Sequence, residues 1–250
     1  MTDIISEIVA HKRVELQAVQ QKRRSMKEAL RRSPSGIIAE FKRKSPSKGW
    51  IHADVLPEQV IPLYAQGGAA ALSILTDEQY FGGTAEFIQR VRSMVDIPIL
   101  RKDFIVSPYQ VYEAKVIGAD AILLIAADLQ PEEYGSLLRL AHQIGLEVLL
   151  EVHDPSELRY LQQGMPDMLG VNNRHLGTFH TDVQISFDMA SRLQETQGPV
   201  LISESGIGSP ETVRRLRAAG FQGFLIGECF MKEPDPGIAL KNFIKELEKK

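Results

Sequence analysis

The sequence of 250 residues has little cysteine, no long apolar run and no excess of positive charge. Its single cysteine, Cys229, excludes an internal disulfide framework and is typical of a reducing compartment. No apolar segment approaches the roughly 18 residues that a membrane-spanning helix needs. The formal net charge of −3 argues against a general nucleic-acid-binding protein, because such a surface is usually basic. We therefore expect a cytoplasmic protein with no nucleic-acid and no membrane partner.

Three sequence signatures are also missing, and each absence excludes a class of protein. The N-terminal stretch MTDIISEIVAHKRVELQ has neither the apolar core nor the small-residue cleavage site of a signal peptide. The six histidines show no convincing ligand spacing with cysteines or carboxylates, so we expect no metal. The dinucleotide-binding pattern G-x-G-x-x-G does not follow the first strand-like run, where KRKSPSKG stands instead.

From residue 37 onward the chain repeats one unit eight times. Each unit opens with a short run rich in Ile, Val and Leu, as expected for a strand that is buried on both faces. A longer amphipathic stretch follows and predicts a helix. The predicted strands are IIAEF (37–41), AALSIL (70–75), IPILRK (97–102), AILLIA (121–126), EVLLEV (147–152), MLGVN (168–172), VLISE (200–204) and GFLIG (223–227).

Helix boundaries are marked in the stretches between these runs. Ser107-Pro108, Asp154-Pro155 and Ser209-Pro210 each place a capping side chain before a proline, a pairing typical of a helix start. Glycines stand where helices should end, at Gly118, Gly145, Gly164 and Gly220. This alternation predicts parallel strands joined by helical crossovers. Eight units favour an α/β fold of the closed (β/α)8 TIM-barrel type over an open doubly wound sheet.

Residues 1–36 lie outside the repeat and predict a helical N-terminal extension. Its first part has the apolar pattern of an amphipathic helix, at Ile5, Ile8, Val9, Leu16 and Val19. Ser25-Met26-Lys27-Glu28 has the spacing of a capping box that opens a second helix. We expect this extension to pack on one end of the barrel (37–250), so that residues 1–250 form a single domain.

Polar and charged side chains stand at the ends of the predicted strands. In a barrel of this type the active site lies at the C-terminal ends of the strands. Residues two apart in a strand share a face, so these side chains should surround one mouth. A surface ion pair is the alternative for any one of them, although it does not explain the set. The set is Glu40, Lys42, Lys102, Phe104, Glu151, Asn172, Arg174, Glu204 and Ser205.

Two features indicate a phosphorylated small-molecule ligand. The cations in FKRKSPSKG, after the first strand, suit an anion at the mouth, and Glu40 compensates at least one of them. Glycines follow the last two strands, in SGIGSP and in GE, where barrels often bind phosphate through backbone N–H groups. Ordinary helix capping remains the alternative for Ser209-Pro210. Phe81 and Phe104 either line a pocket for a planar ring or pack the loops.

The motifs IAEFKRKSPSKG, ILRKDFIV, LLEVHD, GVNNRHL, ISESGI and LIGECFM together resemble the indole-3-glycerol-phosphate synthase family of tryptophan biosynthesis. The similarity covers the whole chain. It implies conversion of 1-(2-carboxyphenylamino)-1-deoxyribulose 5-phosphate to indole-3-glycerol phosphate by ring closure, decarboxylation and dehydration. The resemblance therefore implies a carbon–carbon lyase of the carboxy-lyase type that needs no cofactor. We expect a monomer and leave open an association with other enzymes of the tryptophan pathway.

The resemblance also implies roles for individual residues. Lys102 corresponds to the general acid that protonates the substrate carbonyl, and Glu151 to the general base of the later dehydration. Lys42 and Glu40 correspond to a second acid–base pair, and we expect Lys42 to lower the pKa of Lys102. The substrate-binding set is Asn172, Arg174, Glu204, Ser205, Phe81 and Phe104. The phosphate-binding set is Lys44, Ser45, Gly206, Gly227 and Glu228.

Two positions depart from the family pattern. His175 stands where an acidic residue is expected, so the loop at Arg174 should be held differently. Glu228 replaces a serine found in some members, which leaves only its backbone N–H as a phosphate donor. Two alternatives also remain. One is another sugar-phosphate barrel enzyme of the Schiff-base aldolase type, with Lys102 or Lys42 as the nucleophile, and the other is a non-catalytic phosphate-binding barrel.

Overall fold

The predicted barrel is present in the structure, a computed structural model that describes residues 24–249 except 176, 195 and 197. Eight parallel strands close in the order β1-β10-β9-β8-β7-β6-β5-β4. They are β1 (Ile37–Phe41), β4 (Ala71–Leu75), β5 (Ile99–Lys102), β6 (Ala121–Ile125), β7 (Glu147–Val152), β8 (Met168–Asn172), β9 (Val200–Glu204) and β10 (Gly223–Ile226). The eight strand predictions are confirmed, with the largest difference at β5, which begins at Ile99 rather than at residue 97.

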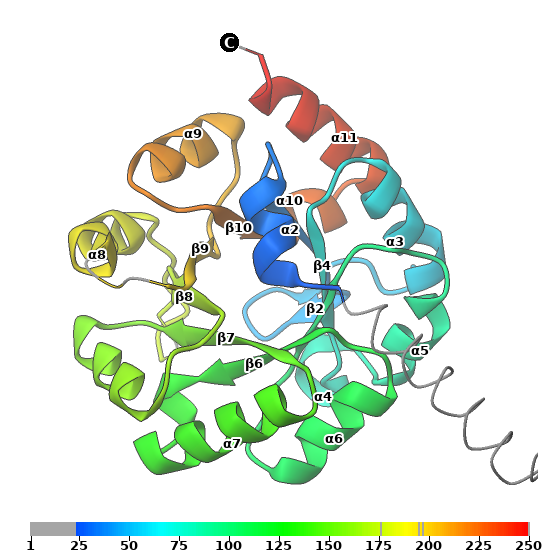
Figure 1. The fold of residues 1–250 in the computed structure, drawn as a ribbon. Coiled ribbons are helices and arrows are strands. Elements are labelled where there is room, and N and C mark those ends of the chain that lie inside the picture. Colours follow the sequence, from blue (N-terminus) through cyan, green and yellow to red (C-terminus); the bar gives the residue numbers. More distant parts are fainter. Residues whose placement is uncertain (1–23, 176, 195, 197, 250) are drawn as a thin grey trace, which may run out of the picture.

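Helices surround the barrel, as Figure 1 shows. The longer ones are α3 (Pro57–Gln66), α5 (Glu86–Arg92), α6 (Pro108–Val116), α7 (Pro131–Gln143), α8 (Gln184–Gln194), α9 (Pro210–Ala218) and α11 (Pro236–Leu247). Short helices follow strands at the mouth: α4 (Glu78–Phe81), η1 (Ala126–Asp128) and α10 (Glu228–Met231). Ser107, Asp154 and Ser209 cap their segments as predicted. However, the segment after Asp154 is a 3-10 helix, η2 (Pro155–Gln163).

Strand residues alternate between two apolar layers. One layer fills the barrel interior with side chains that include Ile38, Leu100 and Leu149. The other lies between the strands and the helices. The alternation continues to the C-terminal ends, where polar residues take the inward positions above the apolar interior. Among the described residues, no helix is long and apolar enough to cross a bilayer.

The barrel is closed at its N-terminal end by α2 (Met26–Arg32), which lies across the centre of the ring in Figure 1. Met26 and Leu30 pack into the interior layer. Ser25 caps the helix by accepting from the N–H of Glu28. The Glu28 carboxylate pairs with arginines of the same helix. The predicted helix over residues 5–19 lies outside the described residues.

A carboxylate from the barrel also caps α2. Glu147, the first residue of β7, accepts from the backbone N–H groups of Met26 at 2.7 Å and Lys27 at 3.0 Å. The Ser25 hydroxyl donates to the same carboxylate at 2.5 Å. A buried carboxylate at a helix N-terminus satisfies donors that have no partner within the helix. This contact fixes the described part of the extension to the barrel.

The loop after β1 contains a small hairpin that the sequence pattern does not predict. Its strands are β2 (Lys44–Ser45) and β3 (Gly49–Trp50), paired antiparallel. Trp50 makes cation–π contacts with two side chains of this loop. The guanidinium of Arg43 lies 5.3 Å and the ammonium of Lys44 5.6 Å from the ring centre. The hairpin gives the cation-rich segment a defined shape beside the barrel mouth.

Candidate active site

The C-terminal ends of the strands surround a cavity of about 910 Å³. Each barrel strand, or the loop that follows it, contributes to the lining. All predicted site residues except Lys44 line it: Glu40, Lys42, Ser45, Phe81, Lys102, Phe104, Glu151, Asn172, Arg174, Glu204, Ser205, Gly206, Gly227 and Glu228. The ammonium of Lys44 instead donates to the carbonyl of Gln79 at 2.7 Å. The sequence pattern therefore identifies the mouth, whereas Lys44 lies beside it on the hairpin.

Lys102 stands at the centre of a buried ionic cluster. Its ammonium donates to Glu151 Oε2 at 3.0 Å and lies 3.7 Å from Glu204 Oε2. Asn172 donates from Nδ2 to the other oxygen of Glu151 at 2.9 Å. The carboxyl groups of Glu151 and Glu204 are both 1% exposed, so these partners rather than bulk water determine their protonation. An ammonium and a carboxylate from different strands therefore meet in the cavity, as a proton-transfer site requires.

The pKa of Lys102 is raised, so the prediction that Lys42 lowers it is wrong. Burial alone would lower the pKa of Lys102, but the carboxylates of Glu151, Glu204 and Glu40 outweigh that effect. Lys42 does not oppose them effectively, because its ammonium is paired with Glu40 at 2.5 Å. Lys102 is therefore an ammonium at neutral pH.

The two carboxylates beside Lys102 have opposite pKa shifts. Burial favours the protonated form of both groups. For Glu151 the Lys102 ammonium and His153 outweigh burial, and the pKa falls below its usual range. For Glu204 burial and the neighbouring Glu151 charge dominate, which raises its pKa. At neutral pH the cluster thus combines an ionised Glu151 with a Glu204 that can carry a proton.

Two glycines make room for the carboxylates. A Cβ at position 170, in β8, would lie 2.2 Å from Glu204 Oε1. A Cβ at position 227 would lie 2.6 Å from Glu40 Oε1 and 3.0 Å from its Cβ. Such distances are far shorter than van der Waals contact, so any larger residue would displace the acid. Gly227 therefore has a packing reason to be glycine apart from the predicted phosphate contact.

The segment after β9 turns sharply under the cavity. Ser205 and Gly206 are both left-handed, with φ of 70° and 75°. This conformation is uncommon for a residue other than glycine. The carbonyl of Ser205 accepts from Asn173 Nδ2 at 3.0 Å, and a Cβ on Gly206 would meet Thr181 at 2.7 Å. At Gly208, by contrast, a Cβ would meet nothing within 4 Å, so this backbone is open to a ligand.

Glu228 joins two loops at the rim of the cavity. Its carboxylate pairs with Lys48 of the hairpin at 2.6 Å and lies 3.9 Å from Arg174. Arg174 also donates to the hydroxyl of Ser47 at 2.7 Å. These cations lower the pKa of Glu228 against the opposing effect of burial. The Glu228 carboxylate is thus ionised, and nearby cations compensate its charge. Its ion pair with Lys48 links α10 to the β2–β3 hairpin.

His175 replaces the expected acid with an equivalent hydrogen-bond acceptor. Its Nδ1 accepts from the backbone N–H groups of Gly177 and Thr178, each at 3.1 Å. The backbone N–H of Arg174 donates to Asn172 Oδ1 at 3.0 Å. The loop after β8 is therefore held at both Arg174 and His175.

Phe81 and Phe104 line the cavity as a contacting aromatic pair. Their ring centres are 6.2 Å apart, and the rings are inclined by 34°. Phe104 is 42% exposed, so part of its ring is accessible from the cavity. The two aromatic rings form an apolar wall of the cavity that also contains the ionic cluster.

His153 is a site residue that the sequence reasoning missed. Its Nε2 lies 3.3 Å from Glu151 Oε1, and its Nδ1 lies 3.7 Å from Glu157 Oε2. Burial would lower the pKa of His153, but these two carboxylates outweigh it and raise the pKa to about 9. The signal was present in the sequence, because His153 follows Glu151 by two positions and so shares its face.

A closed parallel barrel with Lys102, Glu151 and Glu204 clustered at its C-terminal mouth defines a (β/α)8-barrel protein with a buried ionic cluster in its cavity. The family model described as indole-3-glycerol phosphate synthase matches residues 3–247. A protein of that name from Bacteroides thetaiotaomicron is 54% identical over 263 aligned positions, covering 99% of this chain and 100% of its own. One from Carboxydothermus hydrogenoformans is 45% identical, over 87% of this chain and 83% of its own. The chain belongs to the indole-3-glycerol phosphate synthase family.

Solved structures support the fold at low sequence identity. The tryptophan synthase α2β2 complex of Pyrococcus furiosus contains a chain with a TM-score of 0.64 at 16% identity, covering 85% of this chain and 97% of that one. Thiamine phosphate pyrophosphorylase of the same organism gives a TM-score of 0.65 at 15% identity, over 90% and 98%. Identities this low show the barrel fold alone.

Proposed function

We propose that the chain converts 1-(2-carboxyphenylamino)-1-deoxyribulose 5-phosphate to indole-3-glycerol phosphate, releasing CO₂ and water. Family membership supports the reaction, and one observation carries the proposed roles. The Lys102 ammonium lies between Glu151 and Glu204 at the base of the cavity, next to the Phe81–Phe104 pair. The ligand that suits this cavity carries an aromatic ring, a reacting carbonyl and anionic ends.

Lys102 is the proposed general acid of ring closure. When the aromatic carbon attacks the ketone, negative charge develops on the carbonyl oxygen. A fixed ammonium stabilises that charge and then transfers a proton to it. The raised pKa of Lys102 keeps the proton available, because an alkoxide is a much stronger base than an amine. Loss of CO₂ from the same ring carbon restores the charge balance.

Glu151 is the proposed base of the dehydration that follows. Its lowered pKa keeps it ionised, so it can accept the proton that leaves as the ring becomes aromatic. Asn172 fixes one carboxylate oxygen and leaves the other towards Lys102. Glu204, with its raised pKa, can deliver a proton to the departing hydroxyl. Glu40 and Lys42 form the second acid–base pair of the proposal.

The two ends of the substrate have different proposed contacts. The anthranilate ring packs against the Phe81–Phe104 pair, with Arg174 near its carboxylate. The phosphate lies against the backbone at Gly206, Gly227 and Glu228, with Ser45 on the hairpin side; the predicted contact with Lys44 is not retained, because Lys44 lies outside the cavity. The ion pair of Glu228 with Lys48 reduces repulsion between that carboxylate and a phosphate. We further propose a monomeric carboxy-lyase of the cytoplasm.

A Schiff-base aldolase is the second candidate, and the electrostatics oppose it. A nucleophilic lysine must lose its proton, which needs a lowered pKa. Lys102 has a raised pKa among three carboxylates, and Lys42 is paired with Glu40. A non-catalytic barrel would not require an ammonium between an ionised carboxylate and a protonatable one, as Lys102 lies between Glu151 and Glu204.

Indole fluorescence tests the proposed function directly. Incubation of the full chain with the carboxyphenylamino-deoxyribulose phosphate should produce fluorescent indole-3-glycerol phosphate and one equivalent of CO₂. Addition of borohydride during turnover should leave the mass of the protein unchanged. A covalent adduct on Lys102 or Lys42 would support the aldolase, and binding without product would support the non-catalytic barrel.

A further inference from the structure

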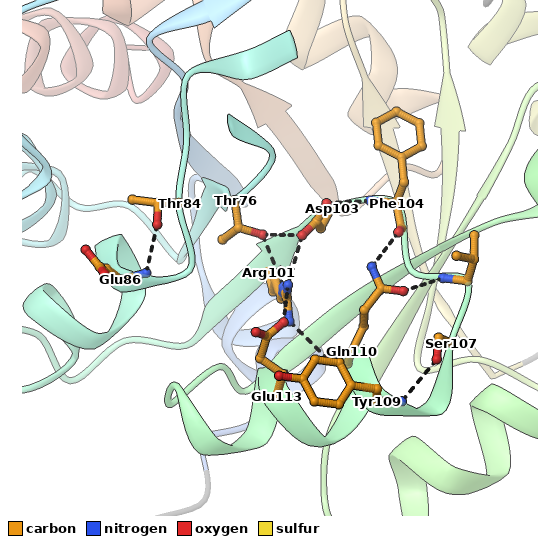
Figure 2. A network of polar contacts seen from close by, with 11 residues as sticks. Thr76, Thr84, Glu86, Arg101, Asp103, Phe104, Ser107, Tyr109, Gln110 and Glu113 are labelled. Atoms are coloured by element: carbon orange, nitrogen blue, oxygen red, sulfur yellow. Dashed lines mark hydrogen bonds and ion pairs between the residues drawn. The ribbon is translucent and has the colours of Figure 1, made fainter. Parts of the chain in front are cut away.

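A buried arginine lies directly beside the proposed catalytic lysine and faces the other way. Strand alternation directs Leu100 into the barrel interior and Lys102 into the cavity. Arg101 lies between them in β5 and points towards α6 (Figure 2). Arg101 is only 4% exposed. Its guanidinium donates from Nε to Thr76 Oγ1 at 3.1 Å and from Nη1 to the carbonyl of Gln110 at 3.1 Å. Two carboxylates complete its shell, Asp103 at 3.0 Å and Glu113 at 2.7 Å, both on Nη2.

These contacts reach the segment that follows Lys102. Asp103 accepts through Oδ2 from Arg101 and also from the Thr76 hydroxyl, the latter at 2.6 Å. Its other oxygen, Oδ1, accepts from the backbone N–H of Phe104 at 2.9 Å. Asp103 therefore connects the guanidinium to the backbone that carries the Phe104 ring.

The far side of the same segment is held by Gln110 of α6, as Figure 2 shows. Its side chain donates to the carbonyl of Phe104 at 2.8 Å and accepts from the N–H of Val106 at 2.9 Å. The main-chain carbonyl of Gln110 is the group that receives Arg101 Nη1. The guanidinium of Arg101 thus binds the start of the loop after β5 through Asp103. It also binds α6, the helix that holds the middle of this loop, through the carbonyl of Gln110. We call the residues that these contacts join the Arg101 network: Thr76, Arg101, Asp103, Phe104, Gln110 and Glu113.

Such a network is an unusual choice for stability alone. A buried ion pair gains little over well-packed apolar side chains of similar size, because both charges lose their hydration. The planar fork of arginine does, however, fix the relative positions of several acceptors at once. Here the acceptors belong to β4, to the loop after β5 and to α6. The two groups that this arrangement orients towards the cavity are the Lys102 and Phe104 side chains.

We propose that Arg101 is a positioning residue that fixes Lys102 and Phe104 for the reaction. This inference rests on the proposed function, since it assigns Arg101 to ring closure through the two side chains next to it. Arg101 does not touch the substrate. It holds residues 103–106 in one conformation, and its loss lets the Phe104 ring and the end of β5 move relative to Glu151.

Arg92, the last residue of α5, provides a matched control near the opposite end of β5. Arg92 donates to the carboxylate of Asp120 at 2.6 Å and to the carbonyls of Val95 at 2.7 Å and Ile97 at 2.9 Å. It supports the turn that leads into β5, far from the mouth. Arg101→Met and Arg92→Met therefore each remove a guanidinium network near one end of β5, a buried one at the mouth and a half-buried one at the opposite end. Gln110→Ala removes the loop contacts while the guanidinium stays, and its partly exposed position makes misfolding a small risk.

Kinetics and amide exchange should separate the two arginines. Both arginine variants should melt at a lower temperature. Below that temperature, Arg101→Met and Gln110→Ala should lose roughly 10- to 100-fold in kcat/KM, and Arg92→Met should keep the wild-type value. In a cycle with Phe104→Ala, the loss caused by Arg101→Met should shrink, because the residue acts through Phe104. Hydrogen exchange at the amides of Phe104 and Val106 should accelerate in the two mouth variants alone.

Each contrary result overturns a different statement. Unchanged exchange at Phe104 and Val106 in both mouth variants would remove the positioning role, whatever the activity. Equal kinetic losses in Arg92→Met would reduce Arg101 to a contributor to stability. Full additivity with Phe104→Ala would show that Arg101 does not act through that ring. A wild-type protein that forms no indole product would instead refute the proposed function, while the exchange experiment would still decide the positioning of the loop.

Discussion

Replacing Gly170 with alanine should displace the Glu204 carboxylate and slow catalysis in a folded barrel. The added Cβ would lie 2.2 Å from Glu204 Oε1 and 3.1 Å from Leu149 Cδ1. A relaxed carbon–oxygen contact is about 3.3 Å, so the oxygen has to retreat by roughly 1 Å. The backbone at Gly170 is not left-handed, so the methyl group acts through this contact alone. Glu204 is buried beside Lys102 and has little space in which to rotate away.

A displacement of this size predicts a large kinetic effect. Misplacement of a catalytic group by about 1 Å can cost roughly 100-fold, so we expect kcat of Gly170→Ala to fall by about 10- to 100-fold. Overpacking of a core costs about 1–3 kcal/mol, which for a chain of this size lowers Tm by roughly 2–12 °C.

Gly223→Ala is the matched control at the other end of the barrel. Its Cβ would lie 2.8 Å from Ile202 Cγ1 and 3.4 Å from Leu30 Cδ1, next to α2. It should therefore melt earlier yet keep its kcat. The assays are the initial rate of indole fluorescence and thermal melting followed by circular dichroism. A wild-type kcat in Gly170→Ala would show that the position of Glu204 is not required, and an equal kinetic loss in Gly223→Ala would show that the effect is global.

Glu147 and His153 carry two further predictions. Glu147→Gln should lower the free energy of unfolding in urea by about 1–3 kcal/mol without changing kcat, because an amide cannot accept from every donor at the start of α2; unchanged stability would contradict this. The imidazolium of His153 stabilises the fold, since its pKa is raised to about 9 from an unfolded value of about 6.5. This stabilisation is complete when the pH is below about 6.5, and it is lost as the pH rises through about 9. The stability advantage of the wild type over His153→Gln should therefore shrink from pH 6.5 to 9.5, and a constant difference would exclude an imidazolium paired with Glu151 and Glu157.

The barrel could be predicted from the sequence because every strand is buried on both faces. A run such as AILLI leaves no polar face, and the glycines and Ser-Pro pairs mark where the chain reverses. The 3-10 geometry of η2 was not predictable, since its capping residue Asp154 and Pro155 suit an α-helix equally well. The β2–β3 hairpin was missed for a different reason: each of its strands has two residues, too few for any periodicity.

The candidate site was predictable where strand alternation applies and not where side chains from different strands meet. Alternation placed Lys102 and Glu151 at one mouth, and the structure brings them to 3.0 Å. It could not give the sign of the pKa shift of Lys102, which depends on Glu204 and Glu40 from other strands. Arg101 was missed because an outward-facing arginine on a strand normally indicates a solvated surface, whereas α6 buries it. The need for glycine at position 170 is visible only once Glu204 lies across it.

The proposed acid–base role of Lys102 can be measured most directly in a single turnover with excess enzyme. Lys102→Met removes the ammonium from between Glu151 and Glu204, and Lys115→Met removes an exposed lysine on α6. Formation of the indole ring should slow by about 100- to 10,000-fold in Lys102→Met and proceed at the wild-type rate in Lys115→Met. A wild-type rate of ring closure in Lys102→Met would contradict the account.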